Sequence, residues 1–136
     1  MLISRGEMLA IVAVVDIAIH GQDRPVRGSD IGPRHGLGAR YLETALRCLA
    51  GSGILTGTRG TSGGYQLARL PSLITVDDIL QALRETQGVA LDGVESSIAT
   101  HTVIPALHDA QMALSRSLQR ITVQDLADRA VSGGQA

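Results

Sequence analysis

Residues 41–69, YLETALRCLAGSGILTGTRGTSGGYQLAR, decide the fold of this chain. The first half of the stretch carries apolar residues at spacings of three and four, which predicts a helix with one buried face. These residues are Leu42, Ala45, Leu46 and Leu49. Two glycines then end the helix, because glycine readily adopts the backbone conformation that follows a helix C-terminus. The stretch therefore predicts an amphipathic helix followed by a sharp break.

The second half of the stretch predicts a two-stranded hairpin. Residues 54–58 and 65–69 suit strands, and the glycine-rich residues 59–64 suit the turn between them. Arg59 lies at the hairpin tip. A helix with a polar outer face beside an arginine-tipped hairpin suits DNA, since the helix can enter a major groove while the hairpin reaches the neighbouring backbone or minor groove.

The outward face of the helix and the hairpin tip supply the candidate DNA contacts. The beginning of a recognition helix usually reaches base edges, and arginine donates two hydrogen bonds to guanine or phosphate. Glu43 repels phosphate, so it either accepts from a cytosine amine or holds a neighbouring arginine. Glycine at the tip allows close approach to the sugar–phosphate chain, and hydroxyl groups donate to phosphate. The candidate set is Arg40, Tyr41, Glu43, Thr44, Arg47, Arg59, Gly60, Thr61 and Ser62.

The segment RGTSGGYQLAR, residues 59–69, resembles the wing of the Rrf-two family of bacterial winged-helix regulators, typified by IscR, NsrR and CymR. The family's wing commonly reads RGxGGGYxLxR, and Ser62 here replaces one glycine. Residues 41–43 and 46–55 match as well, and the resemblance runs from about residue 4 to residue 83. It implies a winged helix-turn-helix fold, double-stranded DNA as the partner and Arg59 as a direct contact.

The charge of the chain is distributed unevenly. Residues 1–69 hold eight arginines and five acids, a net +3, whereas residues 70–136 hold four arginines and eight acids, a net −4, which together give the overall −1. All twelve basic residues are arginine, for which the codon bias of a GC-rich genome is the alternative explanation. The asymmetry places the nucleic-acid-facing surface in the N-terminal half.

Further helices are expected on both sides of this unit. Residues 29–35 predict a short helix capped by Gly28 or Ser29, and residues 75–78 and 122–125 read as capping boxes that begin two more. Residues 5–20 predict an apolar first helix, in which Asp16 is expected to pair with an arginine. The buried positions expected in this helix include Leu9, Val12, Ala13, Ile17 and Ile19.

A long helix is expected from about Val103 to residue 120, after a loop at residues 88–97. Its apolar stripe is larger than the N-terminal half can cover, so we expect a second copy of the chain to bury it. The stripe consists of Ile104, Leu107, Leu114, Leu118 and Ile121. The expected fold class is α+β and mostly helical: a winged helix-turn-helix domain in residues 1–70 and a helical dimerisation region, with a long C-terminal helix, in residues 71–136.

Cofactor binding is not expected. Many members of the family bind an iron–sulfur cluster through three cysteines, but the corresponding residues 87–107 contain none. The single cysteine, Cys48, excludes an internal disulfide, and we interpret it as a small residue that packs against the hairpin, with a redox switch as the alternative. His101 and His108 are interpreted as surface or interface residues; the alternative is a metal or haem sensor completed by nearby carboxylates.

These features indicate a DNA-binding transcription regulator, more readily a repressor, that acts as a homodimer on a pseudo-palindromic operator. The alternative from another class is a protein–protein interaction module of the winged-helix type. No nucleophile–base pair, phosphate-binding loop or paired-carboxylate motif indicates an enzyme. The apolar run at residues 8–19 is too short to span a membrane, so we expect a cytoplasmic protein. Its effector is either a small molecule at the dimer junction, a partner protein, or absent.

Overall fold

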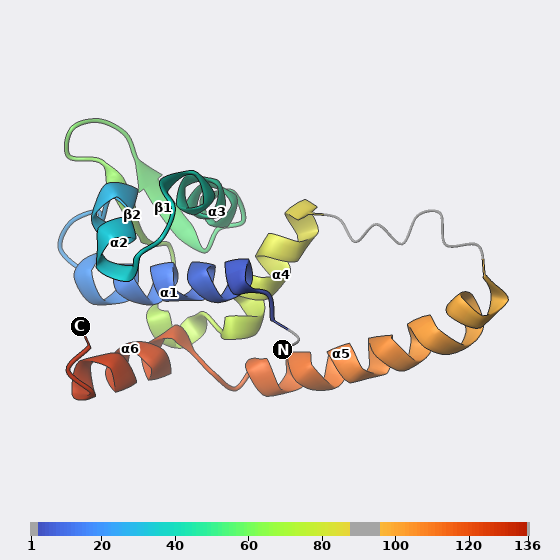
Figure 1. Cartoon of the computed structure of the whole chain (residues 1–136). Coiled ribbons are helices and arrows are strands. Elements are labelled where there is room, and N and C mark those ends of the chain that lie inside the picture. The colour runs from blue at the N-terminus through green and yellow to red at the C-terminus, as the bar shows by residue number, and fades with distance from the viewer. Residues whose placement is uncertain (1–2, 88–95, 136) are drawn as a thin grey trace.

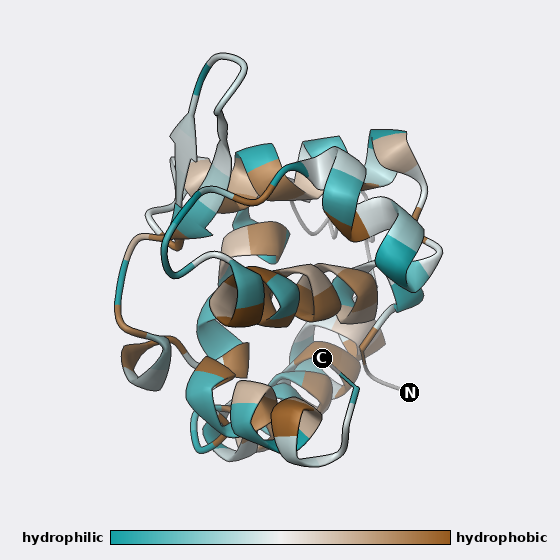
Figure 2. Ribbon diagram, turned by 90° about the vertical axis from the view of Figure 1, so that its left-hand side faces the viewer, coloured by the Kyte–Doolittle hydropathy of each residue, from teal (hydrophilic) through white to brown (hydrophobic). Residues whose placement is uncertain are grey.

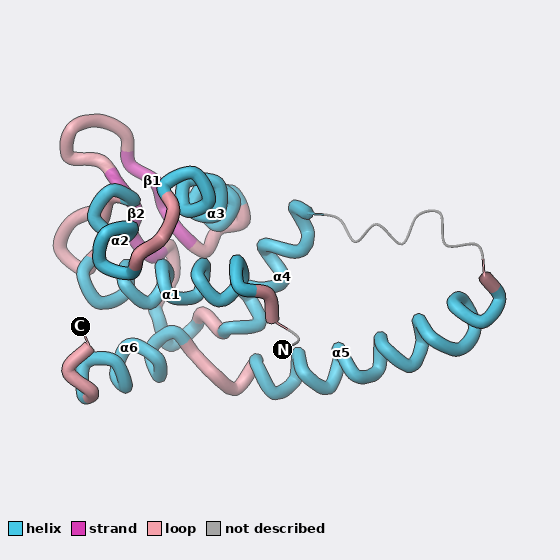
Figure 3. The backbone as a smooth tube through the Cα atoms, viewed as in Figure 1, coloured by secondary structure: helices cyan, strands magenta, loops and turns pink. Residues whose placement is uncertain are grey.

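The computed structural model describes residues 3–87 and 96–135. The fold is mostly helical, and an antiparallel two-stranded hairpin projects from one end of the molecule (Figures 1 and 3). Within the described residues, no helix has both the length and the apolarity needed to cross a membrane. In chain order the elements are α1 (Arg5–His20), α2 (Gly28–His35), α3 (Ala39–Gly51), β1 (Leu55–Thr58), β2 (Gly64–Leu67), η1 (Pro71–Leu73), α4 (Val76–Gln87), η2 (Ala99–Val103), α5 (Ile104–Leu118) and α6 (Val123–Ser132).

Helix α1 lies at the centre of the fold, between the α3–hairpin unit and helix α6 (Figures 1 and 2). It begins at a capping box in which Ser4 and Glu7 bond to each other's backbone amides, as the N-terminus of a helix requires. Its fully buried face is formed mainly by small residues, which allow neighbouring helices to approach closely. These residues are Ala10, Ala13, Val14, Ile17 and Ala18.

The structure corrects part of the expected core face of α1. Ala13 and Ile17 are buried as predicted, but Leu9, Val12 and Ile19 are only partly buried. An almost continuously apolar helix carries little information about which face is innermost, because several registers bury a similar apolar area. The partly exposed residues therefore lie beside the core rather than within it.

Helices α2 and α3 form the helix-turn-helix. Helix α2 begins one residue earlier than expected, with Arg27 at the N-cap and no side-chain cap, so the predicted capping by Gly28 or Ser29 is wrong. Gly36 ends it in the left-handed conformation, at φ 65°, which glycine adopts without strain. Helix α3 buries Leu42 and Leu46, together with the other two residues of its predicted apolar face.

Strands β1 and β2 pair antiparallel, with Leu55 opposite Leu67 and Thr58 opposite Gly64. They are shorter than the predicted strands at residues 54–58 and 65–69. Val26 extends the hairpin at one edge, because its N–H and carbonyl oxygen pair with the backbone of Tyr65 at 2.9 and 2.7 Å. The segment before α2 is thereby tied to the hairpin, and the α+β, mostly helical winged-helix fold is confirmed.

The starts of α4 and α6 lie side by side. Thr75 and Thr122 each cap their helix through the predicted capping box, and their backbones form an antiparallel bridge. The core that contains α1 and α3 also contains Ile74, Ile79 and Val123. Both sides of residue 70 therefore contribute to one core, and the division into two domains at this residue stays a prediction.

Helix α5 leaves the body of the molecule, so that its N-terminal end lies far from α1 (Figure 1). Its C-terminal end packs on its own chain: Leu118 is only 8% exposed and clusters with Val76 and Leu80 of α4. The hydroxyl of Ser115 donates to Oδ1 of the buried Asp77 at 2.7 Å, which fixes α5 against α4.

This packing corrects the predicted dimerisation stripe. Leu118 is covered by its own chain, and Leu114 and Ile121 are partly buried against the same cluster. Ile104 is half-buried, and Leu107 is 64% exposed. The expected stripe therefore has an inner part that holds α5 on α4 and an outer part that is open. The expected loop at residues 88–97 lies mostly outside the described residues.

Candidate nucleic-acid interface

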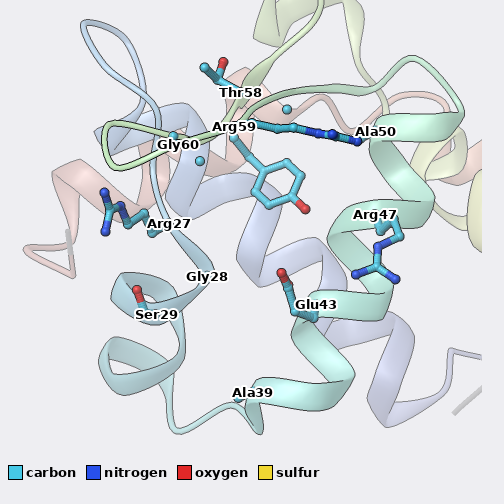
Figure 4. A pocket seen from close by; sticks show the side chains of 14 residues that line it. Arg27, Gly28, Ser29, Ala39, Glu43, Arg47, Ala50, Thr58, Arg59 and Gly60 are labelled. Atoms are coloured by element: carbon cyan, nitrogen blue, oxygen red, sulfur yellow. The ribbon is translucent and has the colours of Figure 1, made fainter.

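Three elements surround a concavity of about 620 Å³ at the end of the molecule that carries the hairpin, and we call its lining the concave surface (Figure 4). The start of α2 forms one side, the outward face of α3 forms the second, and the hairpin, or wing, covers the third. Arg27, Arg47 and Arg59 come from these three elements, and Glu43 is the carboxylate among the lining residues. The concave surface thus combines three positive charges with one negative charge.

Helix α3 presents Glu43 and Arg47 toward this space, one turn apart (Figure 4). Both are exposed, as the polar outer face of an amphipathic helix should be. Arg40 and Thr44 lie on exposed positions of the first turns of α3, beside the concave surface rather than in its lining. The hydroxyl of Thr44 donates to the carbonyl oxygen of Arg40 at 3.0 Å.

Tyr41 was predicted to face DNA, and the structure corrects this. Its ring is half-buried against α1, and its hydroxyl donates to the carbonyl oxygen of Gly6. A Cβ at Gly6 would lie 3.0 Å from the tyrosine hydroxyl, so a larger residue there would press on the tyrosine side chain. Burial raises the pKa of Tyr41, which keeps the hydroxyl as a donor. Tyr41 therefore fastens the start of α3 to α1 and leaves the set of DNA contacts.

The wing tip has the geometry that a close approach to a duplex requires. Arg59, Thr61 and Ser62 are exposed. Gly60 has φ 103°, a conformation that other residues rarely adopt. Ser62, which departs from the family's motif, needs no such conformation, because no non-glycine residue in the described ranges has positive φ. The substitution is therefore compatible with the turn.

Arg27 and Tyr65 are among the residues of the concave surface that the predicted set lacks. Arg27 stands at the N-cap of α2 and faces the same space as the arginines of α3 and the wing. Tyr65 lies in the lining, where burial and the charge of Glu43 raise the pKa of its phenol against the opposing effect of Arg47. The position of Arg27 directly before the first helix of the motif was a usable signal, since that helix crosses the phosphate backbone.

The other candidate sites do not lie at this surface. The thiol of Cys48 donates to the carbonyl oxygen of Ala82 in α4 at 3.5 Å, so Cys48 packs toward α4 rather than toward the wing. His101 and His108 are both exposed. Residues 3–87 and 96–135 contain no group of three or more histidine, cysteine, aspartate or glutamate side chains that could hold a metal ion.

Residues 3–129 match the model of the Rrf2 family, described as iron-dependent transcriptional regulators. The chain is 34% identical over 117 residues to Protein rrf2 of Nitratidesulfovibrio vulgaris, covering 83% of this chain and 78% of that protein. It is 32% identical over 125 residues to the HTH-type transcriptional regulator IscR of Yersinia enterocolitica, covering 88% and 74%.

Solved structures show the same fold. The structure of T. potens IscR superposes with a TM-score of 0.76 at 28% identity, covering 98% of this chain and 91% of that chain. The structure of CymR, the global cysteine regulator of B. subtilis, superposes with a TM-score of 0.70 at 24% identity, covering 93% and 96%.

The residues of this chain do not fit a cysteine-held iron–sulfur cluster. Such clusters are held by several thiolates, and the sequence contains only Cys48, which lies on α3 and packs toward α4. The family is shown by the match of its model to residues 3–129 and by the 34% identity to Protein rrf2 over 83% of this chain. The chain therefore belongs to the Rrf2 family and is a DNA-binding transcription regulator.

Proposed function

We propose that this protein is a homodimeric repressor that binds a pseudo-palindromic operator through the concave surface between α2, α3 and the wing. The observation that carries the proposal is the convergence of Arg27, Arg47 and Arg59 from three separate elements on one exposed surface. Phosphate neutralisation by arginine supplies much of the affinity of such an interface. The proposal includes action in the cytoplasm and no catalytic role.

Each element has a distinct role in this proposal. Helix α3 enters the major groove, where Arg47 donates to guanine or phosphate and Glu43 accepts from a cytosine amine. The first turn of α3 brings Arg40 and Thr44 to base edges or to the adjoining backbone. Arg27 and the start of α2 contact phosphate on the flank, which positions the protein without reading sequence.

The wing follows the backbone on the other flank. Arg59 reaches into the minor groove or onto its phosphates. Gly60 allows the tip to approach the sugar–phosphate chain, and Thr61 and Ser62 donate hydroxyl hydrogen bonds to phosphate. These contacts are sensitive to the width of the groove as well as to its sequence.

The outer part of α5 supports the homodimer. Leu107 and Met112 of α5 are 64% and 46% exposed. Val103 at the end of η2 and Ile98 just before η2 are 44% and 70% exposed. Soluble monomers seldom expose so many neighbouring large apolar side chains. Pairing of α5 with α5 of a second copy would cover them and hold two recognition helices at a fixed separation, as a pseudo-palindromic site demands. Occupation of a promoter by this dimer would block transcription.

The test is selection of duplexes from a random pool, followed by titration of the selected duplex by fluorescence anisotropy. The expected result is a two-fold symmetric site, bound by two chains, with affinity that falls steeply as salt rises. Arg47→Ala should weaken binding, and Arg129→Ala, an exposed arginine on α6 outside the surface, should not. Enrichment of no duplex at low salt would contradict DNA binding and favour a protein partner for the same surface.

A further inference from the structure

A second cavity, of about 530 Å³, is lined by residues of α1, of the end of α2 and of α6. Its apolar walls come from the outer face of α1, including Val12, Val15 and Ile19, and from Leu126 and Ala130 of α6. Two of these residues, Val12 and Ile19, were expected in the core and are only partly buried. Its volume falls within the range of about 300–1,000 Å³ that is typical of sites for small organic molecules.

One end of this cavity is polar and built around a buried carboxylate. The side chain of Asp16 is 1% exposed and accepts hydrogen bonds from Nε and Nη2 of Arg34, both at 2.8 Å. Nε2 of His35 lies 2.7 Å from the same carboxylate, and the charge of His20 also acts on it. The acceptor capacity of Asp16 is therefore used within the protein.

The donor that remains open at this end is the guanidinium of Arg34. The side chains of Arg34 and His35 are 39% and 30% exposed. Among the described residues, no acceptor is paired with Nη1 of Arg34, whose Nε and Nη2 both bond to Asp16. Asp30, one turn earlier on α2, is the other acid whose charge acts on Arg34. An apolar cavity that ends in a permanently charged guanidinium suits a molecule with an apolar body and an anionic head.

The polar end is also the joint that carries the recognition helix. Arg34 and His35 are the last two residues of α2, and residues 36–38 lead directly into α3. Their bonds to Asp16 fasten this turn to α1. A molecule that binds here contacts both α1 and the end of α2, which positions α3. It therefore favours whichever position of α3 it binds more tightly.

We propose that this cavity is an effector site for a small carboxylic acid with an apolar tail. The carboxylate accepts hydrogen bonds from the guanidinium of Arg34, and the tail lies between α1 and α6. This inference rests on the proposed function, because the bound acid regulates DNA affinity by shifting the end of α2.

The first experiment measures binding without DNA. Octanoate is titrated into the full-length protein by calorimetry, beside butanoate, which keeps the head and shortens the tail, and 1-octanol, which keeps the tail and lacks the charge. Saturable binding of one octanoate per chain is expected, with each comparison compound weaker by about tenfold or more. Equal binding of 1-octanol would overturn the assignment of the head group, and no saturable octanoate binding would overturn the site.

A cavity-filling variant tests the location. Ala130→Phe projects a ring into the cavity without removing any bond to Asp16 and should abolish octanoate binding, whereas Ala113→Phe, at an exposed position of α5, should not. If Ala130→Phe instead makes the protein monomeric and octanoate never binds, the cavity is a contact with a second copy and the proposal is wrong.

The second experiment adds operator duplex. Octanoate should change the operator Kd of the unmodified protein by about threefold or more and leave that of Ala130→Phe unchanged. Binding of octanoate with no effect on either Kd would overturn the regulatory role. Because the calorimetry contains no DNA, failure of the proposed DNA binding and failure of this site give different results.

Discussion

The ion pair between Asp16 and Arg34 predicts that substitution of the arginine and substitution of the aspartate destabilise the fold by different amounts. The two partners are unequal in burial, since the carboxylate is 1% exposed and the guanidinium side chain 39% exposed. Removing the arginine leaves a buried charge with one remaining partner, His35. Removing the charge of the aspartate leaves an arginine that can turn to water.

The expected costs differ accordingly. Arg34→Met keeps the aliphatic stem of the arginine and should destabilise the fold by about 2–4 kcal/mol, near the low end for an uncompensated buried ion because His35 still bonds to Asp16. Asp16→Asn keeps the shape and a hydrogen-bond acceptor and should cost about 1–2 kcal/mol. The prediction is that Arg34→Met has a lower free energy of unfolding than Asp16→Asn.

Urea unfolding at pH 7, followed by far-ultraviolet circular dichroism, measures both costs. Tryptophan fluorescence is excluded as the probe because the chain has no tryptophan. Arg129→Met, which replaces an exposed arginine of α6 outside this ion pair, controls for general effects of an arginine-to-methionine substitution. Equal costs, or a larger cost for Asp16→Asn, would refute the argument that burial of the carboxylate determines the energetics of this joint.

Three further predictions follow from the same structure. Leu107→Asp should give a folded monomer with weakened operator binding, whereas Leu118→Asp should unfold the α4–α5 junction, and sedimentation with circular dichroism separates the two results. Burial would raise the pKa of Asp16, but hydrogen bonds from Arg34 and His35 outweigh it and hold the pKa below its ordinary 3.8. The ionised carboxylate therefore stabilises the fold above about pH 4, and this contribution is lost as the pH falls through the lowered pKa. Acid titration of Asp16→Asn should accordingly show a shallower loss of stability below pH 4 than the unmodified protein. The purified protein should show no visible absorbance band, and a stable chromophore formed on reconstitution with iron and sulfide would contradict the cofactor-free account.

The α3–wing unit could be predicted from sequence because its determinants are local. The apolar face of α3 repeats at helical spacing, and a glycine-rich turn between two short strands identifies the hairpin without knowledge of the remaining chain. The two capping boxes were predictable for the same reason, since each is complete within four residues. The ion pair of Asp16 was expected as well, but its partner, 18 residues away, was not.

The predictions that were wrong concern residues whose surroundings depend on contacts with distant parts of the chain. Tyr41 faces outward on a helical projection, yet Gly6, 35 positions earlier, accepts its hydroxyl. Leu118 fits a stripe for a partner helix, yet α4 of the same chain covers it. Arg27 lines the concave surface beside the hairpin, to which its neighbour Val26 is paired. None of these contacts leaves a periodic pattern in the sequence near the residue concerned.

The most direct test of the central claim is the salt dependence of operator affinity for Arg59→Ala, compared with the unmodified protein and with Arg129→Ala. We expect Arg59→Ala to cost about 1–3 kcal/mol of operator affinity and to reduce the slope of log K against log salt by about one, because a groove or phosphate contact of a folded, exposed wing is lost. Arg129→Ala should match the unmodified protein in both quantities. If Arg59→Ala also matches it in affinity and in slope, the wing does not contact DNA and the proposed interface is wrong.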